Sequence, residues 1–145
     1  MTVDLLFRIA NTCALLCWIA LIMLPRWPTV RTVINSMVIG GLCITYAVLI
    51  LVYFFRVEGG GFSTVAQVQR LFESPPVALA GWLHYLAFDL FVGLWIAQRS
   101  DALGLSRWLQ APILAVTFMF GPIGLLLYAA IDAASRVPFI QKLTS

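Results

Sequence analysis

The stretch that decides the fold is residues 77–97, VALAGWLHYLAFDLFVGLWIA, in which His84 and Asp89 stand among apolar side chains. Twenty-one residues with a rise of about 1.5 Å each make a helix of about 31 Å. The hydrocarbon core of a bilayer is about 30 Å thick. The stretch therefore predicts a transmembrane helix that carries a histidine and an acid in its interior.

The composition of the whole chain supports a membrane protein. Hydrophobic residues make up 62% of the 145 residues and charged residues 10%, whereas about 25% of the residues in ordinary globular proteins are charged. The formal net charge is +3, but the arginines stand singly between apolar runs. This spacing is typical of anchors at the membrane surface, so we expect the lipid bilayer and not nucleic acid as the partner.

Three further apolar runs are long enough to cross a bilayer, at about residues 5–24, 33–55 and 112–131. The first is too long for the core of a signal peptide, which is usually 7–15 residues, and we expect it to be retained. Only helices satisfy their backbone groups within single spans of this length. We therefore predict an all-α, integral membrane four-helix bundle that forms one domain over residues 1–145, with Pro112 in the first turn of the fourth span.

The connection between the second and third spans has its own pattern. Gly59, Gly60 and Gly61 form a hinge, and Ser63 is expected to cap a short amphipathic helix over about residues 63–74. Its apolar face indicates a helix on the membrane surface; a lid over a lateral opening is the alternative. An even number of spans would place both ends of the chain on one side, and we expect that side to be the cytoplasm, although the positive charges divide almost evenly.

Asp89 is the most informative residue because it lies close to the middle of its span. A carboxylate at this depth is costly unless it is paired, hydrated or protonated, so it predicts either a functional group or a hydrogen bond to a neighbouring helix. His84 precedes it by five residues, which is about 140° around the helix. The two side chains therefore do not stack, but they could line one cavity from two sides, with Tyr85 one turn from Asp89. A lone histidine argues against a metal or haem centre.

The fourth apolar run contains a predicted kink. Pro122 cannot donate a hydrogen bond to the Phe118 carbonyl, and Gly121 and Gly124 leave the bend without side chains. The bend predicts either close helix packing or room for a flat ligand, to which Tyr128 could add a hydroxyl group. Deeper aromatic residues could line a slot for a long conjugated molecule or could simply pack between helices. We expect Cys13, Cys17 and Cys43 to be small buried hydrophobic residues, with a dithiol or metal role as the alternative.

Two blocks of sequence resemble a known family. Residues 81–93, GWLHYLAFDLFVG, are similar to a signature of the abscisic acid-deficient 4 (neoxanthin synthase-like) family. Pro112 and residues 117–126, TFMFGPIGLL, resemble its second block. With the predicted four-span layout, the resemblance covers about residues 5–132. The start of the chain, MTVDLL, has no plastid transit peptide, which indicates a bacterial member in the cytoplasmic (inner) membrane.

This resemblance implies a chemistry. Plant members are needed to form neoxanthin from violaxanthin, a redox-neutral change in which an epoxide opens to an alcohol and a vinylic proton leaves. Such a reaction needs an acid and a base and no cofactor. The resemblance thus implies Asp89 as the acid and His84 as the base, or the reverse, with Tyr85 or Tyr128 orienting the oxygen. The substrate-binding residues would be Trp82, Phe88, Phe118, Gly121, Pro122 and Gly124.

Three functions remain open from the sequence. The first is a cofactor-independent isomerase of a carotenoid-like lipid. The second is a non-catalytic subunit that binds a carotenoid or isoprenoid in a larger membrane complex. The third, a small proton or ion transporter, is less favoured because there is one deep acid and no inverted repeat. Glycines in the second and fourth spans offer surfaces for a homo-oligomer.

Overall fold

The computed structural model describes residues 2–24 and 27–135, and every regular element within them is a helix. In chain order the elements are α1 (Val3–Met23), α2 (Pro28–Thr32), the π-helix η1 (Val33–Ile39), α3 (Gly40–Tyr53), the 3₁₀ turn η2 (Phe54–Arg56), α4 (Val65–Glu73), α5 (Pro75–Ala102), α6 (Arg107–Phe120) and α7 (Pro122–Ser135).

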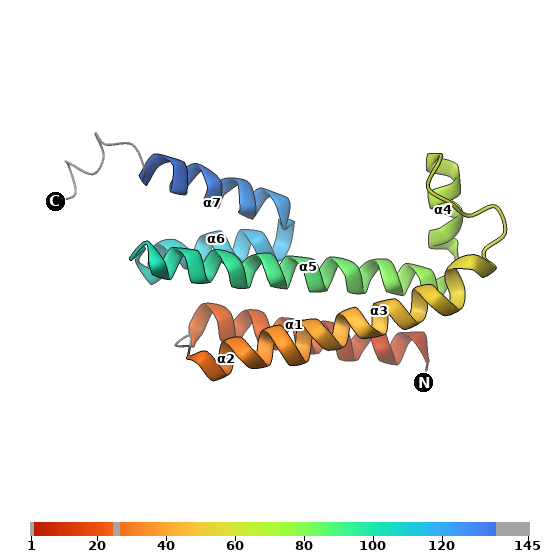
Figure 1. The fold of residues 1–145 in the computed structure, drawn as a ribbon, viewed down its shortest axis with the longest axis horizontal. Helices are drawn as coiled ribbons and strands as arrows, with labels where there is room; N and C mark the ends of the chain where they lie inside the picture. Colours follow the sequence, from red (N-terminus) through yellow and green to blue (C-terminus); the bar gives the residue numbers. More distant parts are fainter. Residues whose placement is uncertain (1, 25–26, 136–145) are drawn as a thin grey trace.

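Three long apolar helices lie side by side along the molecule (Figure 1). They are α1, the continuous helix Pro28–Arg56 that contains η1 and α3, and α5, and within the described residues these are long and apolar enough to cross a membrane. The first three predicted spans thus correspond to helices that are long and apolar enough to cross a membrane. The described part of the chain is all-helical, and its long apolar helices mark it as a membrane protein.

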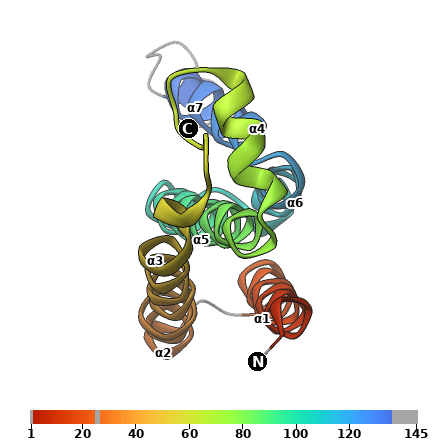
Figure 2. The same cartoon turned by 90° about the vertical axis from the view of Figure 1, so that its right-hand side faces the viewer.

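Helix α5 is the centre of the fold, with α3 and α1 on one side of it and α6 and α7 on the other (Figure 2). Leu83, Leu90 and Ile96 of α5 are almost completely buried in the shared core. Gly93 lets α1 come close, because a β-carbon there would lie 2.6 Å from Cζ3 of the buried Trp18 ring. This packing fixes the rotation of α5 about its axis and therefore the directions of His84 and Asp89.

The single helix predicted over residues 112–131 is not present. The segment forms two helices, α6 and α7, that pack against each other as a hairpin (Figure 1). Each has 14 residues, or about 21 Å at the usual rise per residue, which is too short to cross the hydrocarbon core. Pro112 lies inside α6 and not in its first turn. The four-helix bundle is thus three long helices and a half-length hairpin.

The chain reverses at Gly121, where a kink at Pro122 was predicted. Gly121 has backbone angles of φ 19° and ψ −81°, outside the helical region, and Pro122 has no N–H to continue the helix. Gly124 lets the two arms meet, since a β-carbon there would lie 2.5 Å from the Thr117 backbone. The predicted position of the irregularity was correct, but its size was not: the helix breaks instead of bending.

The hairpin also changes the topology. Helix α6 enters from the end where α5 finishes, and α7 returns toward that end (Figure 1). As a result, Val3 at the start of α1 and Ser135 at the end of α7 lie at opposite ends of the molecule.

The predicted amphipathic helix is α4, which stands across the first turns of α5 (Figures 1 and 2). Its cap is Thr64 and not Ser63: Gln67 N donates to Thr64 Oγ1 at 3.2 Å, while Ser63 N donates to Gln67 Oε1 at 3.1 Å. This reciprocal pair ends the loop with both amide donors satisfied. Phe72 of α4 lies against Gly81 of α5, so the contact needs a residue without a side chain.

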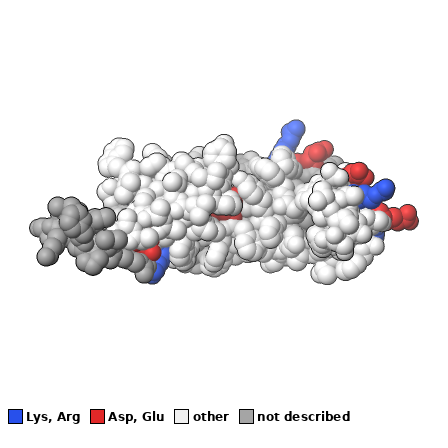
Figure 3. Space-filling view, turned by 90° about the horizontal axis from the view of Figure 1, so that it is seen from above, with Lys and Arg blue, Asp and Glu red and all other residues white. Residues whose placement is uncertain are grey.

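Charged atoms on the face that carries α7 gather toward the two ends, and one small acidic patch interrupts the uncharged middle (Figure 3). The acidic residue at mid-length of α5 is Asp89, whose side chain is partly buried. An uncharged band between charged ends is the pattern expected of a surface that faces lipid.

Candidate functional site

Asp89 of α5 meets the hairpin at its point of reversal. A β-carbon on Gly121 would overlap with Oδ1 of Asp89 and lie 2.8 Å from its Cγ, so the carboxyl group rests directly on the glycine backbone. The first turn of α7 begins at Pro122. Gly121 also ends α6, so the carboxyl group lies at the junction of the two helices.

Tyr85 joins Asp89 at this junction. Its hydroxyl group donates to the Met119 carbonyl of α6 at 3.4 Å and also lies within hydrogen-bonding reach of the Asp89 carboxyl group. The last carbonyls of a helix have no partner within that helix, so Tyr85 supplies one to α6. One tyrosine thus ties the end of α6 to the acid of α5.

One oxygen of Asp89, Oδ2, is buried without a hydrogen-bond partner among the described residues. Leaving a buried carboxylate oxygen unpaired costs free energy. The junction of Asp89, Tyr85 and Gly121 can therefore receive a donor such as a proton, a water molecule or a ligand hydroxyl group.

His84 lies on a different side of α5. Its ring stacks on Phe88 with a centroid distance of 4.5 Å and lies 5.6 Å from the Tyr46 ring of α3. It lines a cavity of about 240 Å³ between α3, α4 and α5, and Asp89 does not line this cavity. As helical geometry predicts, the side chains of His84 and Asp89 do not stack, and they contact different neighbours.

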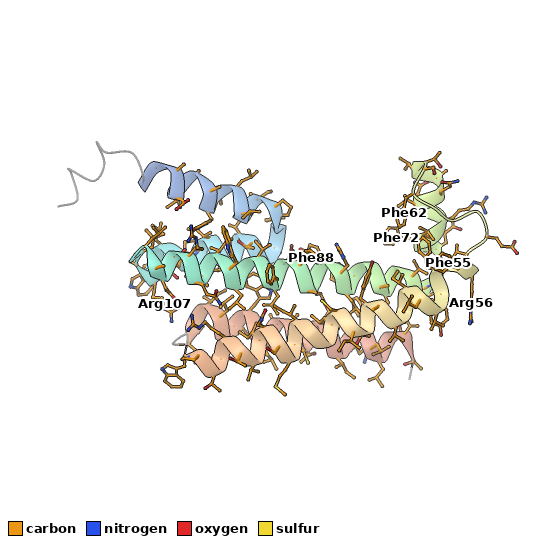
Figure 4. The ribbon with its side chains drawn as sticks, in the orientation of Figure 1. Phe55, Arg56, Phe62, Phe72, Phe88 and Arg107 are labelled. Atoms are coloured by element: carbon orange, nitrogen blue, oxygen red, sulfur yellow. The ribbon has the colours of Figure 1, made fainter. Side chains whose placement is uncertain are left out.

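The wall of the His84 cavity is aromatic. Phe54 and Phe62 stack at 5.4 Å, and Phe72 closes the side near Gly81. Phe62 and Phe72 lie at the α4 end of the molecule, with Phe88 farther along α5 on the same side (Figure 4). An apolar cavity with a few polar groups is the usual character of a small-molecule site, and here those groups are His84 and Tyr46.

Two further cavities lie along α5 at its contact with α3 and η1. We call this line of contact, with its three cavities, the seam. A second cavity of about 200 Å³ is lined by Cys43, Phe88 and Phe91, among others. A third of about 310 Å³ includes Phe91 and ends at Gln98. Phe91 lines both the second and the third cavity, and Phe88 of the second cavity stacks on His84 of the first, so the three cavities follow one another along the helix.

The other predicted site residues are distributed over the fold. The Trp82 ring nitrogen donates to Asn11 Oδ1 of α1 at 3.1 Å, and the centroids of the Phe118 and Trp18 rings are 5.6 Å apart.

Tyr128 is buried, with its ring centroid 5.3 Å from that of Trp95, and its hydroxyl group has no partner among the described residues. Trp95 lies six residues beyond Asp89, about 9 Å along the helix. The structure does not bring Tyr128 next to Asp89.

The free cysteines are placed in two ways. Cys17 is buried, as expected, whereas Cys13 and Cys43 are exposed. The expectation of burial is therefore wrong for Cys13 and Cys43, which lie on helix faces outside the core. No group of three or more histidine, cysteine or acidic residues in the described segments is arranged to hold a metal ion.

The model of the ABA DEFICIENT 4-like family matches residues 5–128. The chain belongs to this family. No curated protein and no solved structure matches it.

The match to the ABA DEFICIENT 4-like family runs from α1 into α7 and therefore includes both regions of interest, the Asp89 junction and the seam. It also includes residues that the sequence did not single out. Tyr46 was missed because a tyrosine in an apolar run is ordinary, and Phe54 and Phe62 because they lie outside the signature blocks. The spacing of Tyr46 and His84 in the sequence contains no signal of their contact.

Proposed function

We propose that this member of the ABA DEFICIENT 4-like family binds a carotenoid-like, conjugated lipid in the seam and isomerises it without a cofactor. The observation that carries the proposal is the contact of His84 with both Phe88 and Tyr46 on the wall of an aromatic cavity. Aromatic faces suit a flat polyene, and His84 and Tyr46 are the proton-transferring groups that such a ligand would touch.

The proposed reaction is redox-neutral. Neutral His84 accepts the proton from the vinylic carbon while the Tyr46 hydroxyl donates its proton to the epoxide oxygen. The carbon–oxygen bond breaks, and its electrons leave on the oxygen. The carbon–hydrogen electrons form the new double bond. The proton then passes from His84 to Tyr46, whose rings are 5.6 Å apart, through the new hydroxyl or a water molecule.

In this proposal Asp89 and Tyr85 are positioning residues. They tie the end of α6 and the turn at Gly121 to α5, and so hold the helix that presents His84. The sequence-based pairing of Asp89 with His84 as acid and base is replaced by His84 with Tyr46, because Asp89 turns toward Gly121 and not into the aromatic cavity. The location that we propose is the bacterial cytoplasmic membrane.

Product analysis tests the proposal. The protein is purified from a carotenoid-producing bacterial host and supplied with an epoxide-bearing carotenoid, and the products are separated by chromatography. We expect His84→Gln and Tyr46→Phe to keep the bound polyene spectrum and to lower conversion about a hundredfold or more. Tyr53→Phe is the matched control, since Tyr53 lies on α3 outside the cavity.

A second function uses the same cavity. A seam that binds a polyene without chemistry would make the chain a pigment-binding subunit, and the exposed, half-open wall around Phe62 and Phe88 favours this. Bound polyene with no product in the wild type, and no effect of His84→Gln, would assign binding alone. A colourless protein that retains no polyene and forms no product would overturn both functions.

A further inference from the structure

The cavity at the Arg31 end of the seam has a more polar lining than the other two cavities. Its cavity of about 310 Å³ lies between α5 and the helix formed by α2 and η1. Arg31, Asn35, Ser36 and Gln98 contribute polar side chains to the lining, whereas the other two cavities of the seam are mainly aromatic or aliphatic. This is therefore a polar chamber at the end of an apolar path.

The polar groups of this chamber are not used by the fold. Within residues 2–24 and 27–135, no hydrogen bond or ion pair involves the side chains of Arg31, Asn35 or Gln98. Arg107 offers a contrast, because its guanidinium group donates to the Leu24 carbonyl at 2.6 Å. A guanidinium group that faces a cavity without an acid in its lining attracts an anion.

The position of the chamber matches the membrane surface. Trp95 is part of its wall, and Trp27 and Trp108 are highly exposed near the same ends of α2 and α6. Tryptophan is enriched where the hydrocarbon core meets the head groups. The chamber therefore lies at the end of the helices that carries the exposed tryptophans, where a lipid head group is expected.

The chamber adjoins the apolar middle cavity of the seam. Phe91 lines both this chamber and the apolar cavity that follows along α5. A molecule with its head beside Arg31 would thus place its chain against Phe91 and Cys43. The arrangement suits an amphiphile and not a free ion.

We propose that the chamber of Arg31, Asn35, Ser36 and Gln98 binds the phosphate head group of an amphiphile whose apolar chain lies in the seam. The phosphate comes either from an anionic phospholipid of the bilayer or from an isoprenoid phosphate. The site goes beyond the proposed isomerase and does not depend on it, because head-group binding needs neither His84 nor Tyr46.

Native mass spectrometry tests the site. The protein is reconstituted in equal amounts of phosphatidylglycerol and phosphatidylcholine with the same acyl chains, then released from the membrane, and the retained lipids are counted. We expect the wild type to retain phosphatidylglycerol selectively and Arg31→Gln to retain it about tenfold less. Arg99→Gln is the matched control, since Arg99 lies beside Gln98 on α5 but does not line the chamber.

A competition experiment distinguishes the two sources of the phosphate group. Displacement of phosphatidylglycerol by a prenyl phosphate, but not by inorganic phosphate, would assign the site to an isoprenoid head; retention of phosphatidylglycerol would assign it to a bilayer lipid. Either result supports the site if Arg31→Gln abolishes the retention of the phosphate-bearing amphiphile. Equal losses in Arg31→Gln and Arg99→Gln, or no preference for anionic lipids in the wild type, would overturn it. Thermal unfolding verifies that Arg31→Gln is folded, as expected for a side chain without a partner.

Discussion

The carboxyl group of Asp89 rests on the backbone of Gly121, at the point where the chain reverses between α6 and α7. The acid of the third span and the glycine of the hairpin therefore form one structural unit. At mid-length of α5 the carboxyl group lies between Tyr85 and the turn that joins α6 to α7.

The contact predicts that Gly121 does not accept a side chain. In Gly121→Ala the new methyl group would collide with the Asp89 carboxyl group, and we expect a loss of about 1–3 kcal/mol in the free energy of unfolding. Thermal unfolding in detergent measures the loss. Gly41→Ala is the matched control because a β-carbon at Gly41 has no atom within 4 Å. Equal stabilities of the two variants would contradict the contact.

Asp89 is expected to act through its hydrogen bond more than through its charge. Asp89→Asn keeps an acceptor for Tyr85 and removes the cost of a buried charge, so its stability should stay within about 1 kcal/mol of the wild type. Asp89→Leu leaves Tyr85 with one acceptor fewer and should lose about 1–2 kcal/mol. A loss in Asp89→Asn as large as that in Asp89→Leu would show that the fold needs the negative charge.

Gly93, like Gly121, should not tolerate a larger side chain. A β-carbon there meets the Trp18 ring, so Gly93→Val should push α1 away from α5, with a loss of about 1–3 kcal/mol. Loss of the contact between Trp18 and α5 should change the tryptophan emission spectrum. An unchanged emission spectrum and an unchanged unfolding temperature would mean that α1 does not pack on α5 as described.

Much of this architecture was predictable from the sequence, because hydropathy and length alone define the first three spans. The hairpin was not predictable in this way. Residues 112–131 satisfy the same length rule, and the break depends on the tertiary contacts of Gly124 with Thr117 and of Gly121 with Asp89. The divergence of His84 and Asp89 followed from helical geometry, whereas the contact of His84 with Tyr46 joins two helices whose register the sequence does not show.

The hairpin has a topological consequence that can be measured. Single cysteines introduced by Thr2→Cys and by Ala134→Cys, in a background with Cys13, Cys17 and Cys43 changed to serine, should react with an impermeant maleimide from opposite sides of the membrane. A continuous fourth span would place both on one side. Labelling of the two positions from the same side would therefore contradict the three-span topology.

A bulky side chain in the middle of the seam should prevent polyene binding. Cys43 lines the middle cavity of the seam, whereas Cys13 lines a groove between α1 and α3, and both are exposed. Cys43→Trp should fill the path, and Cys13→Trp is the matched control. The measurement is the polyene absorbance retained per purified protein. We expect Cys43→Trp to lose about nine-tenths or more of this absorbance, as for a binding penalty of about 1.4 kcal/mol or more, and Cys13→Trp to keep it. Equal polyene in both variants and the wild type would contradict binding in the seam.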